Sequence, residues 1–166
     1  METNELTFSA VLTSLILVIE VLAAKTGESM VILTVFSTLP LYILTCKKIR
    51  LGLMSYSIVA LVLLMINFHQ LIFFLCTNGL IGLTLGVLSK YKKVLRIVVT
   101  ASISVIGLLG VSLILGINLF GIVYKSSMVV GVIIIFVIMI IYCWLYDWFA
   151  RMIDGRVNKI VKQSRG

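Results

Sequence analysis

Six apolar segments follow one another along the chain, separated by short polar or basic stretches. They cover about residues 6–24, 30–46, 51–67, 71–88, 94–120 and 127–149. A helix needs roughly 17–25 predominantly apolar residues to cross the hydrocarbon layer of a bilayer, and the second and third segments only just reach this length. The pattern predicts an all-α, polytopic membrane protein with six transmembrane helices.

The fourth segment also predicts how one of these helices packs. It reads LIFFLCTNGLIGLTLGVLSKYKK over residues 71–93, with Gly79, Gly82 and Gly86 at helical spacing. Gly82 and Gly86 have the small-xxx-small spacing that lets the backbone of a second helix come close. No glycine run here ends in the Lys-Ser/Thr that a phosphate-binding loop requires, so we interpret the glycines as a packing face. The lysines that follow should end the helix at the cytoplasmic surface.

The composition indicates a single domain in the membrane. Of 166 residues, 61% are hydrophobic and 12% are charged, whereas about a quarter of a soluble domain is charged. We expect one transmembrane domain over residues 1–166, with a short cytoplasmic N-terminus and a basic cytoplasmic tail at about 151–166. The start, METNEL, lacks the basic n-region of a signal peptide, so the first apolar segment should be retained.

The three cysteines give no sign of a metal site or a disulfide. Cys46, Cys76 and Cys143 lie in separate apolar segments without the spacing of metal ligands. They are interpreted as small buried hydrophobes. No metal and no cofactor are expected.

The basic residues predict the orientation. All but two of the 14 Lys and Arg residues follow the second, fourth or sixth segment, and the exceptions are Lys25 and Lys125. Because basic loops stay in the cytoplasm, both termini are expected on the inner side of the cell (plasma) membrane. Topology thereby accounts for the net charge of +8 without a nucleic-acid partner. Aromatic rings, which favour the interface, crowd the inner end of the last segment: Tyr142, Trp144, Tyr146 and Trp148.

Polar residues at membrane depth are the candidates for a ligand site, since a charge there costs roughly 2.5–3.5 kcal/mol on insertion scales. Glu20 lies near the outer end of the first segment and either belongs to a pocket, pairs with Lys25 or reaches the interface. Asn78 lies about two turns into the fourth segment, where its amide must form hydrogen bonds with another helix or with a bound molecule. A ligand entering from the outer face should meet a group formed by the first segment, the outer turn and the fourth segment: Glu20, Asn67, His69, Gln70 and Asn78.

The remaining polar residues do not form a catalytic set. Asp147 and Arg151 are spaced i, i+4, which favours a surface ion pair, and Arg96 is expected to extend to the inner interface. The single histidine, His69, has no nucleophile or carboxylate at a recognised motif spacing. No enzymatic activity is expected.

A strip of small residues lies in the cytoplasmic half of the first segment: Ser9, Ala10, Thr13 and Ser14. Small residues allow close helix approach in lipid, where apolar helices associate mainly by packing. We expect this strip to contact either a partner protein or another helix of the same chain.

Three stretches resemble a known family: LTFSAVLTSLILVIEVLA, STLPLYILTCKKIRLGLMSYSIVALVLLM and NGLIGLTLGVLSKYKK. With Leu39-Pro40 before a basic turn, Gly52 just after it and the glycine helix followed by lysines, residues 6–116 resemble the YybS-like membrane proteins. Those look related to the substrate-binding S components of energy-coupling-factor (ECF) vitamin transporters. Ala10 and Ser14 keep the small-xxx-small spacing of the S-component coupling patch, whereas the outer connections at 25–29 and 68–70 are shorter than S-component gating loops.

The resemblance implies a six-helix, S-component-like bundle with a pocket open to the outside. It also implies a small-molecule substrate and a partner, a transmembrane coupling protein driven by two cytoplasmic ATPases. We therefore expect a substrate-binding subunit of an ECF-type transporter. A non-catalytic membrane scaffold in the manner of the rod-shape protein MreD remains open, as does a self-contained proton-coupled transporter based on Glu20. A pocket with convergent polar groups would favour transport, since a scaffold needs only a lateral face.

Overall fold

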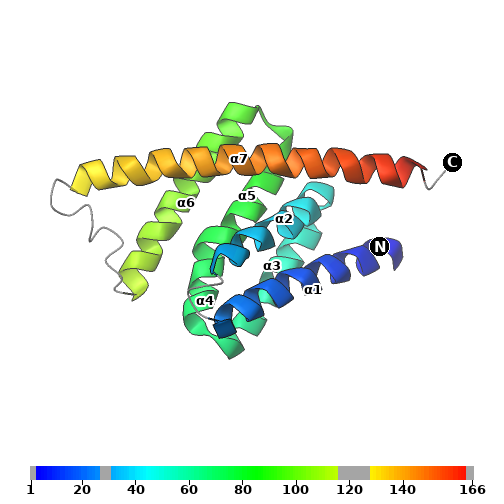
Figure 1. Ribbon diagram of the computed structural model, residues 1–166, viewed down its shortest axis with the longest axis horizontal. Coiled ribbons are helices and arrows are strands. Elements are labelled where there is room, and N and C mark those ends of the chain that lie inside the picture. Colours follow the sequence, from blue (N-terminus) through cyan, green and yellow to red (C-terminus); the bar gives the residue numbers. More distant parts are fainter. Residues whose placement is uncertain (1–2, 27–30, 116–127, 164–166) are drawn as a thin grey trace.

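The computed structural model describes residues 3–26, 31–115 and 128–163 (Figure 1). Every element in these ranges is helical: α1 (Thr3–Thr26), α2 (Val31–Lys47), α3 (Ile49–Ile66), α4 (Phe68–Phe73), the π-helical turn η2 (Phe74–Asn78), α5 (Gly79–Val87), the 3-10 turn η3 (Leu88–Lys90), α6 (Lys93–Leu115) and α7 (Met128–Gln163). Lys125 and the tail beyond residue 163 lie outside the described residues.

Five helical stretches in this part of the chain are long and apolar enough to cross a bilayer: Glu5–Thr26, Ile49–Ile66, Phe68–Lys90, Lys93–Leu113 and Val130–Met152. They correspond to five of the six predicted segments, so the all-α, multi-pass architecture agrees with the sequence. The remaining predicted span is α2. It is a helix of 17 residues and is not among the five.

The short helix α2 lies at the centre of the molecule, beside α1, α3 and α5 (Figure 1). Leu41 and Leu44 are fully buried, as are the hydroxyl-bearing side chains of Ser37 and Thr38. Pro40 lies inside the helix, where proline removes one backbone hydrogen bond. Neighbouring helices thus surround α2, which makes it a core element.

Glycines allow α5 to pack directly on α2. A Cβ added at Gly82 would lie 2.8 Å from the Thr38 carbonyl oxygen, and one at Gly86 would overlap the Thr45 side chain. The prediction that Gly82 and Gly86 form a packing face is confirmed. The helix also ends where the lysines begin, as predicted. After α5 comes η3, which ends at Lys90, and Tyr91 is then extended.

The described basic turns gather at one end of the helices. Lys48, after α2, pairs with Glu5 at the start of α1, and Lys93, at the start of α6, lies 5.5 Å from the centre of the Trp144 ring near the middle of α7. A hollow of about 730 Å³ is lined by both Lys48 and Lys90. The start of α1 and the end of α7 consequently lie on the same side of the molecule, at the right of Figure 1.

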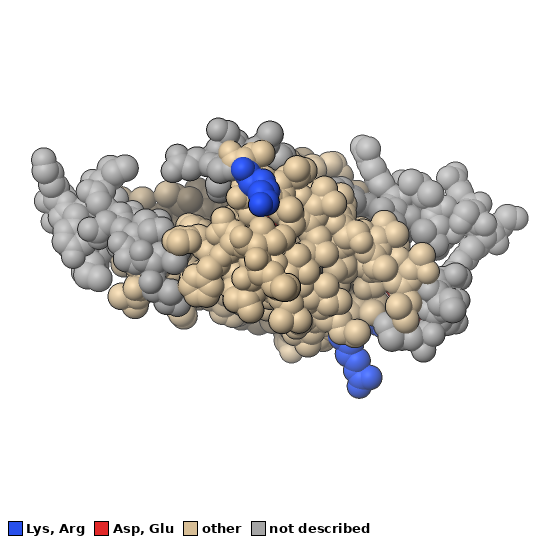
Figure 2. All heavy atoms as spheres, turned by 90° about the horizontal axis from the view of Figure 1, so that it is seen from below, with Lys and Arg blue, Asp and Glu red and all other residues tan. Residues whose placement is uncertain are grey.

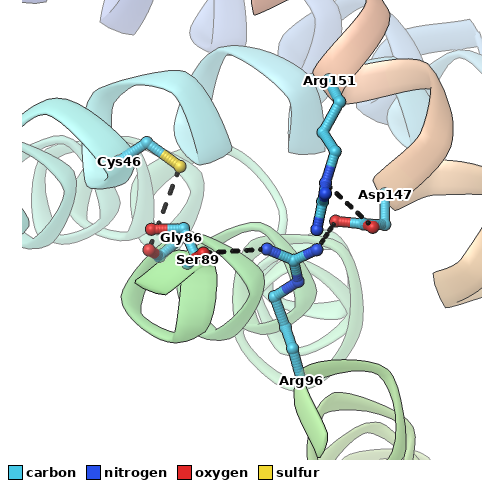
Figure 3. A network of polar contacts seen from close by, with 6 residues as sticks. All are labelled: Cys46, Gly86, Ser89, Arg96, Asp147 and Arg151. Carbon is cyan, nitrogen blue, oxygen red and sulfur yellow. Dashed lines mark hydrogen bonds and ion pairs between the residues drawn. The ribbon is translucent and has the colours of Figure 1, made fainter. Parts of the chain in front are cut away.

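A buried ion pair joins α6 to α7 at this end (Figure 3). The Arg96 guanidinium lies 2.5 Å from Asp147 Oδ1, and the two side chains are 1% and 0% exposed. Arg96 also donates to the Ser89 carbonyl at 3.1 Å, while the half-exposed Arg151 lies 3.3 Å from the second Asp147 oxygen. The predicted i, i+4 pair of Asp147 and Arg151 is therefore present, but Asp147 is buried and not at the surface. The expectation that Arg96 reaches outward is wrong, because α6 and α7 cross here and enclose its charge.

The outer surface of the helices is largely apolar. Large hydrophobic side chains of α1 are about half exposed, among them Val11, Leu15, Val18 and Leu22. In Figure 2 basic side chains appear only toward two edges of a broad uncharged face. Soluble monomers rarely expose apolar patches larger than a few hundred Å², so such a face suits hydrocarbon.

Candidate functional site

A cavity of about 550 Å³ opens between α1, α2, α4, η2, α6 and α7. Four of the five predicted site residues line it: Asn67, His69, Gln70 and Asn78. The first three follow α3, at the end opposite the basic turn that precedes this helix. Small-molecule sites usually measure roughly 300–1,000 Å³, so the cavity has a suitable size.

Glu20 lies behind the cavity wall, where it is fully buried. Ser37 donates a hydrogen bond of 2.6 Å to one carboxylate oxygen, and the Gln70 amide nitrogen donates one of 2.7 Å to the other. These contacts replace the pairing with Lys25 and the exposure at the interface that the sequence left open. The carboxylate therefore positions Gln70 instead of facing the cavity itself.

Asn67 shapes the turn that carries the site. Its backbone is extended, and its side-chain oxygen accepts hydrogen bonds from the backbone N–H groups of His69 at 3.0 Å and Gln70 at 3.3 Å. This is an N-cap, a position where asparagine is among the preferred residues. The cap begins α4 and thereby directs the His69 and Gln70 side chains to the cavity.

The π-helical turn η2 presents a second group of polar side chains. One extra residue in a turn rotates all following side chains by about 100°, and such bulges are frequent at functional sites. Thr77 and Asn78, at the end of η2, line the cavity. Gly107 of α6 packs against the Cys76 carbonyl, where a Cβ would collide with it.

Asn78 fills one of the two roles that the sequence left open, the bond to another helix, and its contact with a ligand stays a prediction. Its amide nitrogen donates a hydrogen bond of 2.7 Å to the Thr34 hydroxyl on α2, so it joins two helices. It also contributes to the cavity wall.

Three polar residues of the wall were not predicted from the sequence: Thr34, Thr77 and Tyr142. Thr34 carries a hydroxyl within an apolar segment. Many threonines with a purely structural role do the same, so this position is a weak signal of a binding site. Tyr142 was expected among the interfacial aromatics, of which Trp144 and Trp148 are indeed exposed. Tyr146 instead points inward and donates to the Val35 carbonyl at 3.1 Å.

The small-residue strip on α1 is divided between two faces. Thr13 is buried and shares a hydrogen bond of 2.7 Å with Ser55 on α3, while the partly buried Ser9 supplies the carbonyl that the Thr13 hydroxyl bonds. Ala10 and Ser14 are exposed. One edge of the strip thus packs within the chain, and the other faces outward.

The described residues include no group of three His, Cys, Asp or Glu side chains that could hold a metal ion. Within the described residues, Cys46, Cys76 and Cys143 form no disulfide bond. The polar and apolar residues of the cavity wall offer hydrogen bonds and apolar contact to a ligand.

Comparison with known proteins leaves the residues themselves as the basis for a functional assignment. No family model, curated protein or solved structure matches the chain.

Proposed function

We propose that the protein is the substrate-binding membrane subunit of an ECF-type transporter and captures a small molecule in the cavity. The observation that carries the proposal is the convergence of polar side chains from two parts of the chain, the turn at Asn67–Gln70 and the end of η2, on one cavity of about 550 Å³. A scaffold needs no such cavity.

The proposed orientation places the cavity at the outer side of the membrane. Basic residues favour the cytoplasmic side, and the described basic turns lie at the opposite end of α3 from Asn67. The substrate then enters from outside, and both termini lie in the cytoplasm. In this arrangement α2 is the sixth span, short because neighbouring helices surround it.

Release to the cytoplasm requires a partner in this proposal. Between the cavity and the basic end lies a packed core that includes Leu85, Tyr42 and Tyr146, followed by the Arg96–Asp147 pair. A coupling protein with two cytoplasmic ATPases would supply the free energy to open this path. Ala10 and Ser14 are the proposed contact, because small outward residues let a partner helix approach closely.

The two alternatives have less support. A self-contained proton-coupled transporter would use Glu20, yet both of its oxygens accept hydrogen bonds from the protein and the residue does not line the cavity. A scaffold would use only the apolar lateral faces, and the convergent polar groups would have no role.

Co-purification in mild detergent from the encoding cells tests the proposal. We expect a complex that contains a membrane coupling protein and ATPases. The Ala10→Leu/Ser14→Leu variant should lose these partners, whereas Val18→Leu, at an exposed position on the same helix, should keep them. Recovery of cell-wall or secretion proteins in their place would contradict the transporter assignment.

A further inference from the structure

Several hydrogen-bonding side chains of the cavity wall share one property: each uses its donor within the protein and keeps acceptor capacity for a ligand. Gln70 is the first of them. Its amide nitrogen donates to Glu20. The Glu20 oxygen is the acceptor of this bond, so the amide turns its nitrogen toward Glu20. The side-chain oxygen of Gln70 (Oε1), a residue of the cavity wall, makes no hydrogen bond within the described part of the chain.

The polar groups of η2 are oriented in the same way. The side-chain nitrogen of Asn78 (Nδ2) donates to the Thr34 hydroxyl, and its side-chain oxygen (Oδ1) has no partner among the described residues. The Thr77 hydroxyl donates to the Phe73 carbonyl, which leaves its lone pairs as acceptors. Residues 70, 77 and 78 all line the cavity, with the π-helical turn between the first and the other two.

The hydrogen bond to Glu20 strengthens this acceptor character. A carboxylate that accepts from the N–H of an amide polarises the amide and adds negative charge to its oxygen, as in other hydrogen-bond chains. No Lys or Arg is among the described residues that line the cavity. The polar groups around Gln70 therefore favour a ligand that donates hydrogen bonds, such as an amine.

The other polar groups do not reverse this preference. Tyr142 and His69 can each donate or accept and do not select a sign. Asn67 uses its oxygen for the cap and can offer its neutral nitrogen to a ligand. A single neutral donor is a weak counterpart for a carboxylate, which usually binds to charged donors or to several N–H groups.

The rest of the wall is apolar and includes Phe73, Ile81, Leu108 and Met139. We infer, on the basis of the proposed function, that the substrate is a small amphipathic amine, or a neutral molecule rich in N–H or O–H groups, and that anions are rejected. Its donors bond the oxygens of Gln70, Thr77 and Asn78, and its apolar body lies against the other residues.

Three probes with one ring system test the inference: tryptamine, tryptophol and indole-3-acetate. Their binding to the purified full-length chain in detergent micelles is measured by native mass spectrometry and by thermal shift. A charge-assisted hydrogen bond exceeds a neutral one by roughly 1 kcal/mol or more, so tryptamine should bind at least about five-fold more tightly than indole-3-acetate. Tryptophol should lie between them.

Two variants assign the preference to Glu20. Glu20→Gln should reduce the advantage of tryptamine over tryptophol several-fold, whereas Glu5→Gln, which removes a carboxylate at the other end of α1, should leave it unchanged. The comparison of the three probes on the unaltered chain does not depend on whether Glu20→Gln folds.

The outcomes separate the inference from the proposed function. Indole-3-acetate binding as tightly as tryptamine would overturn the inference and leave the cavity as a ligand site. An unchanged amine preference in folded Glu20→Gln would overturn the role of Glu20. Binding of none of the three probes would contradict the proposed function together with the inference.

Discussion

The buried pair between Arg96 and Asp147 makes the sharpest prediction about stability. Replacing Asp147 with leucine leaves the Arg96 guanidinium, 1% exposed, with the Ser89 carbonyl as its recorded acceptor. Breaking a buried pair by removing one partner typically costs about 3–5 kcal/mol. We expect a loss of this size in the free energy of unfolding.

Removing the other partner, Arg96, should lower the free energy of unfolding by a smaller amount. In Arg96→Met, Asp147 keeps Arg151, whose Nε lies 3.3 Å away. Replacing both charges together removes the desolvation penalty of the pair, which is often neutral or even stabilising. The double variant Arg96→Met/Asp147→Leu should therefore be no less stable than Asp147→Leu alone, with a coupling energy of at least about 2 kcal/mol.

Equilibrium unfolding in mixed micelles, followed by circular dichroism and tryptophan fluorescence, measures all three variants. Arg151→Met is the matched control, because this side chain is 51% exposed and exposed pairs contribute about 0–1 kcal/mol. Additive losses in Arg96→Met and Asp147→Leu would refute the reasoning. A loss in Arg151→Met as large as that in Asp147→Leu would refute it too.

Three further predictions follow from other contacts. Gly86→Ala should lower stability by about 1–3 kcal/mol through overpacking against Thr45, while Gly110→Ala, with no atom within 4 Å of the added Cβ, should be neutral or slightly stabilising in the same unfolding assay. Asn67→Ala should cost roughly 0.5–2 kcal/mol by removing the cap and weaken probe binding, whereas Asn67→Asp should keep the cap and the stability. In a cysteine-free background, Thr26→Cys should react with a membrane-impermeant maleimide in intact cells and Arg50→Cys only after lysis; the opposite pattern would overturn the proposed orientation.

Much of the fold could be predicted from local pattern. The lengths of the apolar segments predict the helices, and the glycines at 82 and 86 predict a packing face, because both signals lie within one segment. The grouping of Gln70 with Asn78 was predicted from topology, because the start of the fourth segment lies on the same side as the turn before it. Asn67 directly precedes the helix that begins there.

The partners of buried charges could not be predicted in this way. Ser37 and Gln70 bond Glu20 because of the rotation of α2 and α4 relative to α1, and Arg96 meets Asp147 because of the crossing of α6 and α7. These rotations depend on packing between helices, for which an apolar sequence carries little information. The π-helical turn at Phe74–Asn78 likewise has no signature that distinguishes it from an ordinary helical turn.

The central claim is that the cavity holds a small molecule. The most direct measurement is extraction and mass spectrometry of whatever remains bound to the full-length chain purified from its own membranes. Ala24 lines the cavity, so Ala24→Trp should fill it without removing a described hydrogen bond, and Val18→Trp on the exposed face of the same helix is the control.

The account predicts one small molecule, near one equivalent per chain, in the unaltered protein and in Val18→Trp, and its absence from Ala24→Trp. An equal amount in all three proteins, or lipid as the only bound species, would contradict it.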